Sequence, residues 1–151
     1  PETHRAVSPM GIQRIRSGSA GKIRKIMTKS ILLVGLGGAA GSILRFLTQV
    51  FVSRYFAGVF PLATFTANML GCLIIGILLG IMERNQVADA SMRLLLVTGF
   101  CGGYTTFSTF AADNFQLMQS GNSPTALLNM GASLLVSLLA VWLGLMLVKV
   151  V

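Results

Sequence analysis

Residues 99–110 read Gly-Phe-Cys-Gly-Gly-Tyr-Thr-Thr-Phe-Ser-Thr-Phe, within a run from Leu94 to Ala112 that carries no charge. The run is apolar enough to form part of a membrane span, but its glycines and its Ser and Thr hydroxyls make a poor continuous helix. Non-helical backbone at membrane depth is stable only where it is buried in protein or lines a watery cavity. Two interpretations stay open: a cation site made of freed carbonyl oxygens, or a kink whose hydroxyls bond back to the helix.

The sequence on either side of this stretch is also apolar. Hydrophobic residues make up 54% of the chain and charged residues only 11%, whereas a soluble domain carries about 25% charge. A membrane helix needs about 20 mostly apolar residues. We therefore predict an all-α membrane protein with four spans, at about 31–53, 61–82, 93–118 and 125–149. Pro61 suits the start of the second span, a polar loop covers 83–89, and residues 119–124 form a turn cluster.

The composition excludes several classes of function. Four acidic residues and one histidine, His4, argue against hydrolases, His-rich metal sites and catalytic triads, so we do not expect an enzyme. The net charge of +8 does not indicate nucleic-acid binding, because seven of the twelve basic residues precede residue 30. Cys72 and Cys101 lie in apolar segments and are typical of small buried side chains rather than of a disulfide framework.

The first 30 residues differ from the rest of the chain. Residues 1–30 are polar and basic, and we predict a disordered N-terminal extension followed by a four-span membrane channel domain at 31–151. Met27 is a candidate internal start, because the apolar body begins four residues later. A signal peptide would also open with basic residues, but no clear small-residue cleavage site follows Lys29.

Small residues recur four positions apart in three of the spans, a spacing that lets helix backbones approach closely in lipid. The pairs are Gly37 and Gly41, Gly76 and Gly80, and Ala140 and Gly144. Packing within one subunit and packing between two subunits both stay open.

Basic residues in short loops set membrane orientation. Four spans would place Lys29, Arg84, Arg93 and Lys149 on one side, against either Arg54 alone or Arg54 with Arg45 on the other. This small bias is compatible with insertion in both directions and hence with an antiparallel dimer. The residues before Lys29 add six basic residues to the first side and favour a single orientation.

Three side chains in the spans could contact an anion. Phe107 and Phe110 are three residues apart and share a helix face, and aromatic rings have positive edges. Asn68 lies in mid-span, where its amide could donate hydrogen bonds to an anion. The alternatives are lipid-facing or core aromatic rings and an amide that joins two helices.

The sequence resembles the CrcB/Fluc fluoride channels over about residues 31–150. The resemblance rests on Gly37-Gly38-Ala39-Ala40-Gly41-Ser42-Ile43-Leu44-Arg45, on Thr66-Ala67-Asn68-Met69-Leu70-Gly71 and on residues 99–110. It implies a four-helix subunit with a broken third helix, an antiparallel dual-topology homodimer and two fluoride pores. It also implies a structural sodium ion at the dimer centre, held by backbone oxygens at the break.

The resemblance assigns roles to residues of this chain. Gly102 and Thr105 would supply the sodium-binding carbonyls, and Phe107, Phe110 and Asn68 would face fluoride with ring edges and an amide. Neighbouring hydroxyls would come from Ser108 and Thr109, a polar track from Ser137, and a structural arginine at the end of the first helix from Arg45. The chain departs from the pattern at Val141, where threonine is frequent, and at Asp113, where glutamate is commoner.

We therefore expect a multi-pass protein of the bacterial inner membrane that exports fluoride passively and protects against fluoride toxicity, with membrane lipid as its surroundings. A pore for a strongly hydrated anion must supply donors without binding too tightly to permit exit, and no lysine lies between Lys29 and Lys149. One alternative is a small proton-coupled multidrug exporter, which needs a titratable group in its pathway; Asp113 is the only acid beyond the loops. A second alternative is an assembly factor that transports nothing.

Overall fold

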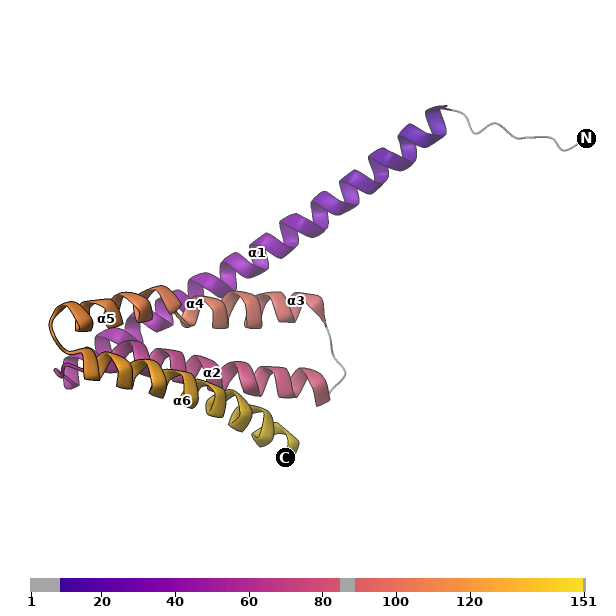
Figure 1. Ribbon diagram of the computed structural model, residues 1–151. Coiled ribbons are helices and arrows are strands. Elements are labelled where there is room, and N and C mark those ends of the chain that lie inside the picture. Colours follow the sequence, from indigo (N-terminus) through magenta and orange to yellow (C-terminus); the bar gives the residue numbers. More distant parts are fainter. Residues whose placement is uncertain (1–8, 85–88, 151) are drawn as a thin grey trace, which may run out of the picture. The chain divides into compact units, whose positions relative to one another are not determined.

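The structure is a computed structural model that describes residues 9–84 and 89–150, with side chains described from residue 21 onward. Over these residues every element is a helix (Figure 1). The chain divides into two compact units, Pro1–Leu32 and Leu33–Val151. The second unit contains all the candidate site residues.

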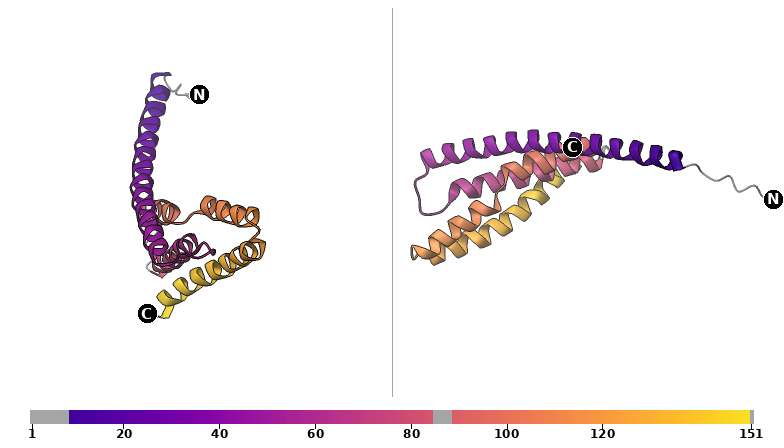
Figure 2. Two further views of the ribbon diagram at one scale, coloured as in Figure 1. Left: turned by 90° about the vertical axis from the view of Figure 1, so that its left-hand side faces the viewer. Right: turned by 90° about the horizontal axis from the view of Figure 1, so that it is seen from above.

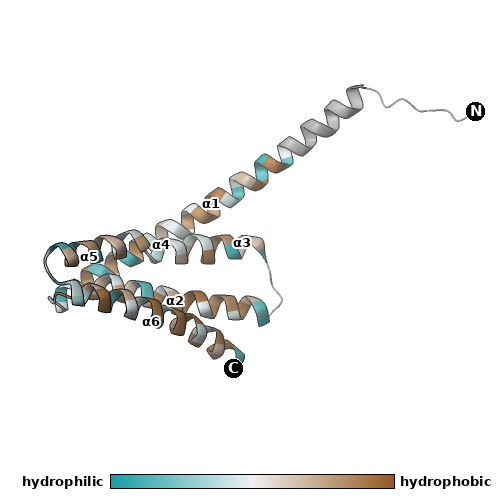
Figure 3. Cartoon of the chain, in the orientation of Figure 1, coloured by the Kyte–Doolittle hydropathy of each residue, from teal (hydrophilic) through white to brown (hydrophobic). Residues whose placement is uncertain are grey.

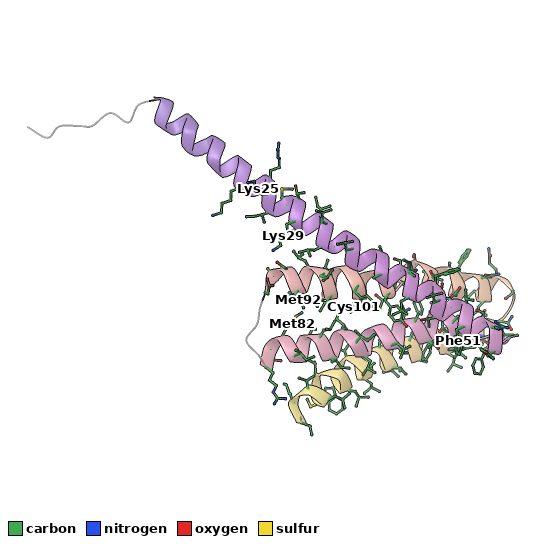
Figure 4. All side chains as sticks on the ribbon, turned by 180° about the vertical axis from the view of Figure 1, so that it is seen from behind. Lys25, Lys29, Phe51, Met82, Met92 and Cys101 are labelled. Carbon is green, nitrogen blue, oxygen red and sulfur yellow. The ribbon has the colours of Figure 1, made fainter. Side chains whose placement is uncertain are left out.

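Helix α1 runs from Pro9 to Tyr55 and is 47 residues long, more than twice what a membrane crossing requires. Residues 9–30 are thus helical where the sequence analysis expects disorder, and residues 1–8 lie outside the described part of the chain. Helix-forming residues follow Pro9 without a further proline, and proline itself suits a first turn. In the part of this stretch that is coloured in Figure 3, from residue 21 onward, hydrophilic residues are present, and Figure 4 shows Lys25 and Lys29 pointing outward from the helix.

Helices α2 (Leu62–Arg84) and α6 (Ser123–Val150) pack side by side along most of their length (Figures 1 and 2). Glycines bring the two backbones together: Gly76 lies against the backbone of Val141, and Gly144 lies against Leu73 and Gly76. These small residues therefore pack within the subunit, as one of the two interpretations left open for them predicts.

The third apolar segment is made of four helical pieces. They are α3 (Ala90–Met92), the π-helix η1 (Arg93–Cys101), α4 (Gly102–Tyr104) and α5 (Phe107–Gln119). Thr105 and Thr106, between α4 and α5, both have extended backbone, with φ and ψ of −84° and 155° and of −147° and 121°. The π-helix is not predicted by the residue pattern.

Glycines also join α1 to the third segment within the second unit. Added side-chain carbons at Gly37 and Gly41 would collide with the backbone of η1 and α4, and one at Gly103 would collide with Gly38. Close backbone contact of this kind replaces the hydrophobic driving force that is missing between helices in lipid. The glycines of residues 37–45 therefore allow α1 to pack closely against η1 and α4, the pieces that precede the interruption.

The turn between α5 and α6 matches the predicted cluster at 119–124. Gly121 has φ of +80°, a conformation that suits glycine, and the N–H of Asn122 donates to the carbonyl of Leu117 at 2.8 Å. α6 begins at Ser123, two residues after Gly121.

Four helical stretches are long and apolar enough to cross a membrane: Gly21–Tyr55, Leu62–Arg84, Ala90–Gln119 and Ser123–Val150. The predicted number of spans is confirmed, and the strongly hydrophobic colouring of α2 and α6 in Figure 3 agrees with it. Exposed leucines along α6, such as Leu134, Leu135 and Leu138, suit a surface that faces lipid or another subunit.

Candidate functional site

The interruption between α4 and α5 is paired with a side chain of α2. The N–H of Thr106 donates to Oδ1 of Asn68 at 2.8 Å, and Nδ2 of Asn68 donates to the carbonyl of Thr106 at 3.1 Å. The carboxamide thus bonds to both polar groups of one backbone residue. Because an unpaired backbone group in an apolar environment costs several kcal/mol, at an order of magnitude, this pairing stabilises the extended backbone.

Thr106 also caps α5. Its side-chain Oγ1 accepts the N–H of Thr109 at 3.2 Å and donates to Oγ1 of Thr109 at 3.1 Å. A hydroxyl of Ser108 lies 3.3 Å from the same oxygen. Thr106 is 8% exposed, so this cluster of hydroxyls is built around a buried oxygen.

These two interactions determine which carbonyls are free. In a continuous helix Gly102 would accept from the N–H of Thr106, and Thr105 would accept from the N–H of Thr109. Both donors are bound elsewhere, to Asn68 and to the Thr106 hydroxyl. Gly102 is exposed, with open space where a side chain would project. Freed carbonyl oxygens of this kind fit a hard monovalent cation such as sodium.

A cavity of about 670 Å³ lies beside the break and is lined mostly by apolar side chains. Its wall includes six of the residues that the sequence analysis selects: Asn68, Gly102, Thr105, Phe107, Phe110 and Ser137. They come from α2, α4, α5, α6 and the extended link. The fold therefore brings together residues that are 69 positions apart, Asn68 and Ser137, in one hollow.

Phe107 and Phe110 form a pair on α5. Their ring centroids are 5.7 Å apart with planes tilted by 39°, as expected for residues three apart on a helix. Phe107 is 80% exposed in the single subunit, whereas Phe110 is half-buried. An apolar ring exposed to this degree needs lipid or another subunit to cover it.

A buried chain of polar side chains was missed by the sequence analysis. Nδ2 of Asn129 donates to Oδ1 of Asn114 at 3.0 Å, and Oγ of Ser133 lies 3.3 Å from Oδ1 of Asn129. Asn114 donates in turn to the carbonyl of Phe110 at 2.7 Å. One signal was present in the sequence: Asn129, Ser133 and Ser137 are each four residues apart on an apolar helix.

A family model described as "CrcB-like protein, Camphor Resistance (CrcB)" matches residues 32–145 of the chain. The chain belongs to the CrcB family. Together with the four apolar helices, this makes it a multi-pass bacterial membrane protein. The match leaves out most of the basic N-terminal residues of this CrcB protein.

Several relatives share the name "Fluoride-specific ion channel FluC". That of Azobacteroides pseudotrichonymphae is 45% identical over 118 residues, which cover 78% of this chain and 94% of the relative. That of Flavobacterium psychrophilum is 42% identical over 121 residues, 80% of this chain and 98% of the relative. That of Campylobacter fetus is 45% identical over 122 residues, 80% and 94% respectively. These names are those of ion channels, so the family is not one of enzymes.

Two other predicted residues of this CrcB protein contribute to the cap rather than to the cavity wall. Ser108 and Thr109 are outside the residues that line the cavity, and their hydroxyls meet the Thr106 oxygen instead. Ser137 lines the cavity, and its hydroxyl lies 3.9 Å from the sulfur of Met69.

Arg45 lies within α1, ten residues before the helix ends, and not at its end as the resemblance implies. The apolar residues after it contain no helix breaker until Gly58 and Pro61, so the helix continues to Tyr55. Nε of Arg45 is buried and has no hydrogen-bond partner among the described residues.

The two departures from the family pattern both lie away from the cavity. The backbone of Val141 packs against Gly76, so this residue belongs to the contact between α6 and α2. Asp113 lines a separate cavity of about 270 Å³ with Val59, Gln116 and neighbours. Its Oδ2 is buried and has no hydrogen-bond partner in the part of the chain that the structure describes.

Cys72 and Cys101 are free thiols, as expected. Both line the main cavity, Cys72 half-buried and Cys101 2% exposed. Cys101, labelled in Figure 4, is the last residue of η1, and its carbonyl accepts both the N–H and the hydroxyl of Thr105. The cysteine backbone thus fixes the residue that begins the extended link.

Proposed function

We propose that this CrcB protein is a fluoride-specific ion channel, through which fluoride leaves the cytoplasm passively and which thereby protects the cell against fluoride toxicity. The observation that carries the proposal is the extent of the likeness: relatives with that name are 42–45% identical and are covered over 94–98% of their length. The family model matches residues 32–145, which include the whole of the candidate site.

The chemistry of the cavity supports an anion pathway without a fixed charge. Asn68 uses one amide hydrogen for Thr106 and keeps a second, which can donate to fluoride. The edges of Phe107 and Phe110 carry partial positive charge, and Ser137 adds a hydroxyl to the same wall. Such donors can replace water around fluoride while holding it weakly enough to release it.

The carbonyls of Gly102 and Thr105 would hold a structural sodium ion at the centre of a dimer. The ion would supply positive charge that closes the interruption and makes the surroundings of the cavity more favourable for an anion. The redirected donors of Thr106 and Thr109 support this assignment, because they leave both oxygens available.

We further propose that two copies of the chain assemble in opposite orientations and form two pores. Phe107, 80% exposed in one subunit, would be covered by the partner. Two subunits would also supply four carbonyls to one cation, which is closer to the coordination number that a hard cation prefers than two would be.

Purified protein in liposomes loaded with potassium fluoride tests the proposal. Fluoride should leave rapidly once a potassium ionophore is added, with no proton gradient, while chloride-loaded vesicles should retain chloride. Absence of fluoride flux from vesicles shown to contain folded protein would contradict the proposal. Slow, pH-driven flux of organic cations would instead support a proton-coupled exporter, which the names of the relatives do not favour.

A further inference from the structure

We infer that Thr106 is a positioning residue for the proposed cation site: its side-chain oxygen withholds the Thr109 N–H from the Thr105 carbonyl and so keeps that carbonyl free for the cation. The inference rests on the proposed function, since it concerns the cation that the break would hold. It adds a role for a residue that neither lines the pore with an aromatic ring nor donates a carbonyl to the ion.

Thr106 occupies the position before the first residue of α5. The N–H of Thr109 lies 3.2 Å from Oγ1 of Thr106, and the Thr106 backbone is extended with φ of −147°. A side-chain oxygen at the position before a helix takes a first-turn N–H in this manner. Were that oxygen removed, the Thr105 carbonyl is the acceptor to which Thr109 would donate in an unbroken helix.

The Thr109 N–H and the cation would compete for the Thr105 carbonyl. A carbonyl that accepts a backbone hydrogen bond has less electron density to offer a cation, and the helical geometry would direct it along the helix axis. Thr109 is half-buried beside the buried Thr106, and an unpaired N–H that is shielded from water is strongly driven to find an acceptor. If the Thr106 side-chain oxygen is deleted, the Thr109 N–H therefore competes with the cation for the Thr105 carbonyl oxygen.

Thr106 and Asn68 protect different carbonyl groups. Asn68 binds the N–H of Thr106 and so protects the Gly102 carbonyl, whereas the Thr106 hydroxyl protects the Thr105 carbonyl. One donor is diverted by a side chain of α2, and the other by a side chain of the link itself. The two proposed ligands therefore depend on different residues, and a change at Thr106 leaves the Asn68 pair in place.

The test compares Thr106→Val, which has the same shape without the oxygen, with Thr106→Ser, which keeps it. For each purified protein we would titrate sodium against a large organic cation and measure two quantities, the midpoint of thermal unfolding and the rate of fluoride efflux. Thr106→Val should raise the sodium concentration needed for half the effect by roughly 3- to 10-fold, the factor that corresponds to one net hydrogen bond. Thr106→Ser should restore the wild-type value.

Thr48→Val is the matched control. The Thr48 hydroxyl lies 3.1 Å from the hydroxyl of buried Tyr104, beside the break, but diverts no donor from a carbonyl of the link. This variant should lower the unfolding temperature and leave the sodium concentration for half effect unchanged. An equal sodium shift in Thr48→Val would overturn the inference, because it would show a general response to lost stability.

Wild-type sodium dependence in Thr106→Val would also overturn it. If Thr106→Val does not fold, Thr106→Ala and Thr106→Asn carry the same comparison, since alanine lacks a capping oxygen and asparagine supplies one. Loss of folding in both deletions, without rescue by sodium, would assign the hydroxyl to folding alone. The proposed channel function fails separately, if the wild type passes no fluoride. The proposed sodium site fails if fluoride efflux and the unfolding midpoint of the wild type are both independent of sodium.

Discussion

Asn68 on α2 and Thr106 on the extended link bind each other through two hydrogen bonds, of 2.8 and 3.1 Å, in the way that neighbouring β-strands pair. One carboxamide thus takes the place of a backbone partner for a residue that belongs to no helix. The same side chain lines the main cavity. Asn68 therefore both stabilises the extended link and faces the proposed fluoride pathway.

Asn68→Ala should reduce fluoride efflux at least tenfold while the protein still folds. Both backbone groups of Thr106 would lose their partner, at roughly 1–3 kcal/mol for each unsatisfied group, and the cavity would lose its amide. Efflux from liposomes and the unfolding midpoint measure the two effects. Asn122→Ala, in the turn before α6, removes an amide that, among the described residues, bonds only to Ser120, and it should leave efflux unchanged. Equal losses in both variants would contradict the prediction.

Phe107→Ile should abolish most fluoride efflux with little effect on the subunit's stability. The Phe107 ring is 80% exposed and lines the cavity, so its loss removes a positive ring edge and little buried contact within the subunit. Phe115→Ile is the control: it lies on the same helix and is 60% exposed, but lies outside the cavity lining. Fluoride efflux at the wild-type rate from Phe107→Ile would remove the aromatic edge from the proposed pathway.

Asn129→Ala should destabilise the fold by roughly 1–3 kcal/mol, because it leaves Oδ1 of Asn114 buried without its donor. Chemical unfolding in detergent would measure the difference. Leu128→Ala, at the preceding position and 63% exposed, should change stability by less than about 0.5 kcal/mol. A larger effect at Leu128 than at Asn129 would show that the buried amides contribute little.

Gly41→Ala should prevent close packing of α1 against the third segment. The added methyl group would meet the carbonyl of Phe100 and the N–H of Tyr104, both backbone atoms that cannot move aside. Gly35→Ala, on the same helix with open space around it, should be neutral or slightly stabilising through its higher helix propensity. The comparison needs only the yield of folded protein and its unfolding midpoint; identical values would refute the packing argument.

Opposite orientations of two subunits predict two labelled populations. In a protein with both Cys72 and Cys101 replaced by alanine, Ser123→Cys should react with a membrane-impermeant maleimide in some chains and be protected in others. Neutralising Lys22, Arg24, Lys25 and Lys29 should bring the two populations closer to equality, because basic residues near a span bias its orientation. Labelling of all chains or of none in intact cells would contradict an antiparallel homodimer.

The sequence was sufficient for the elements that depend on composition. Long apolar stretches with few or no charges predict the spans, and Gly121 with its polar neighbours predicts the last turn. The start of α1 was not predictable from hydropathy, because the helix continues through basic residues that form helices readily. The π-helix η1 leaves no composition signal that distinguishes it from an α-helix.

The site was predictable as a list of residues but not as a set of contacts. Six selected residues line one cavity, yet the bonds from Asn68 to Thr106 span 38 positions and depend on how α2 packs. Ser108 and Thr109 were assigned to the pore by resemblance, while their hydroxyls contact the cap oxygen. Asn114 and Asn129 were overlooked because each is unremarkable alone and informative only once their 3.0 Å bond is known.

The two extended residues also alter the rotational phase of the third crossing. An extended residue advances about 3.3 Å and reverses the direction of its side chain, against about 1.5 Å and 100° in a helix, so the angular sequence of α4 does not carry into α5. Gly103, before the link, meets Gly38, while Asn114, after it, meets Asn129. Each half-crossing is therefore aligned by its own neighbour, and a substitution that twists one half need not misalign the other.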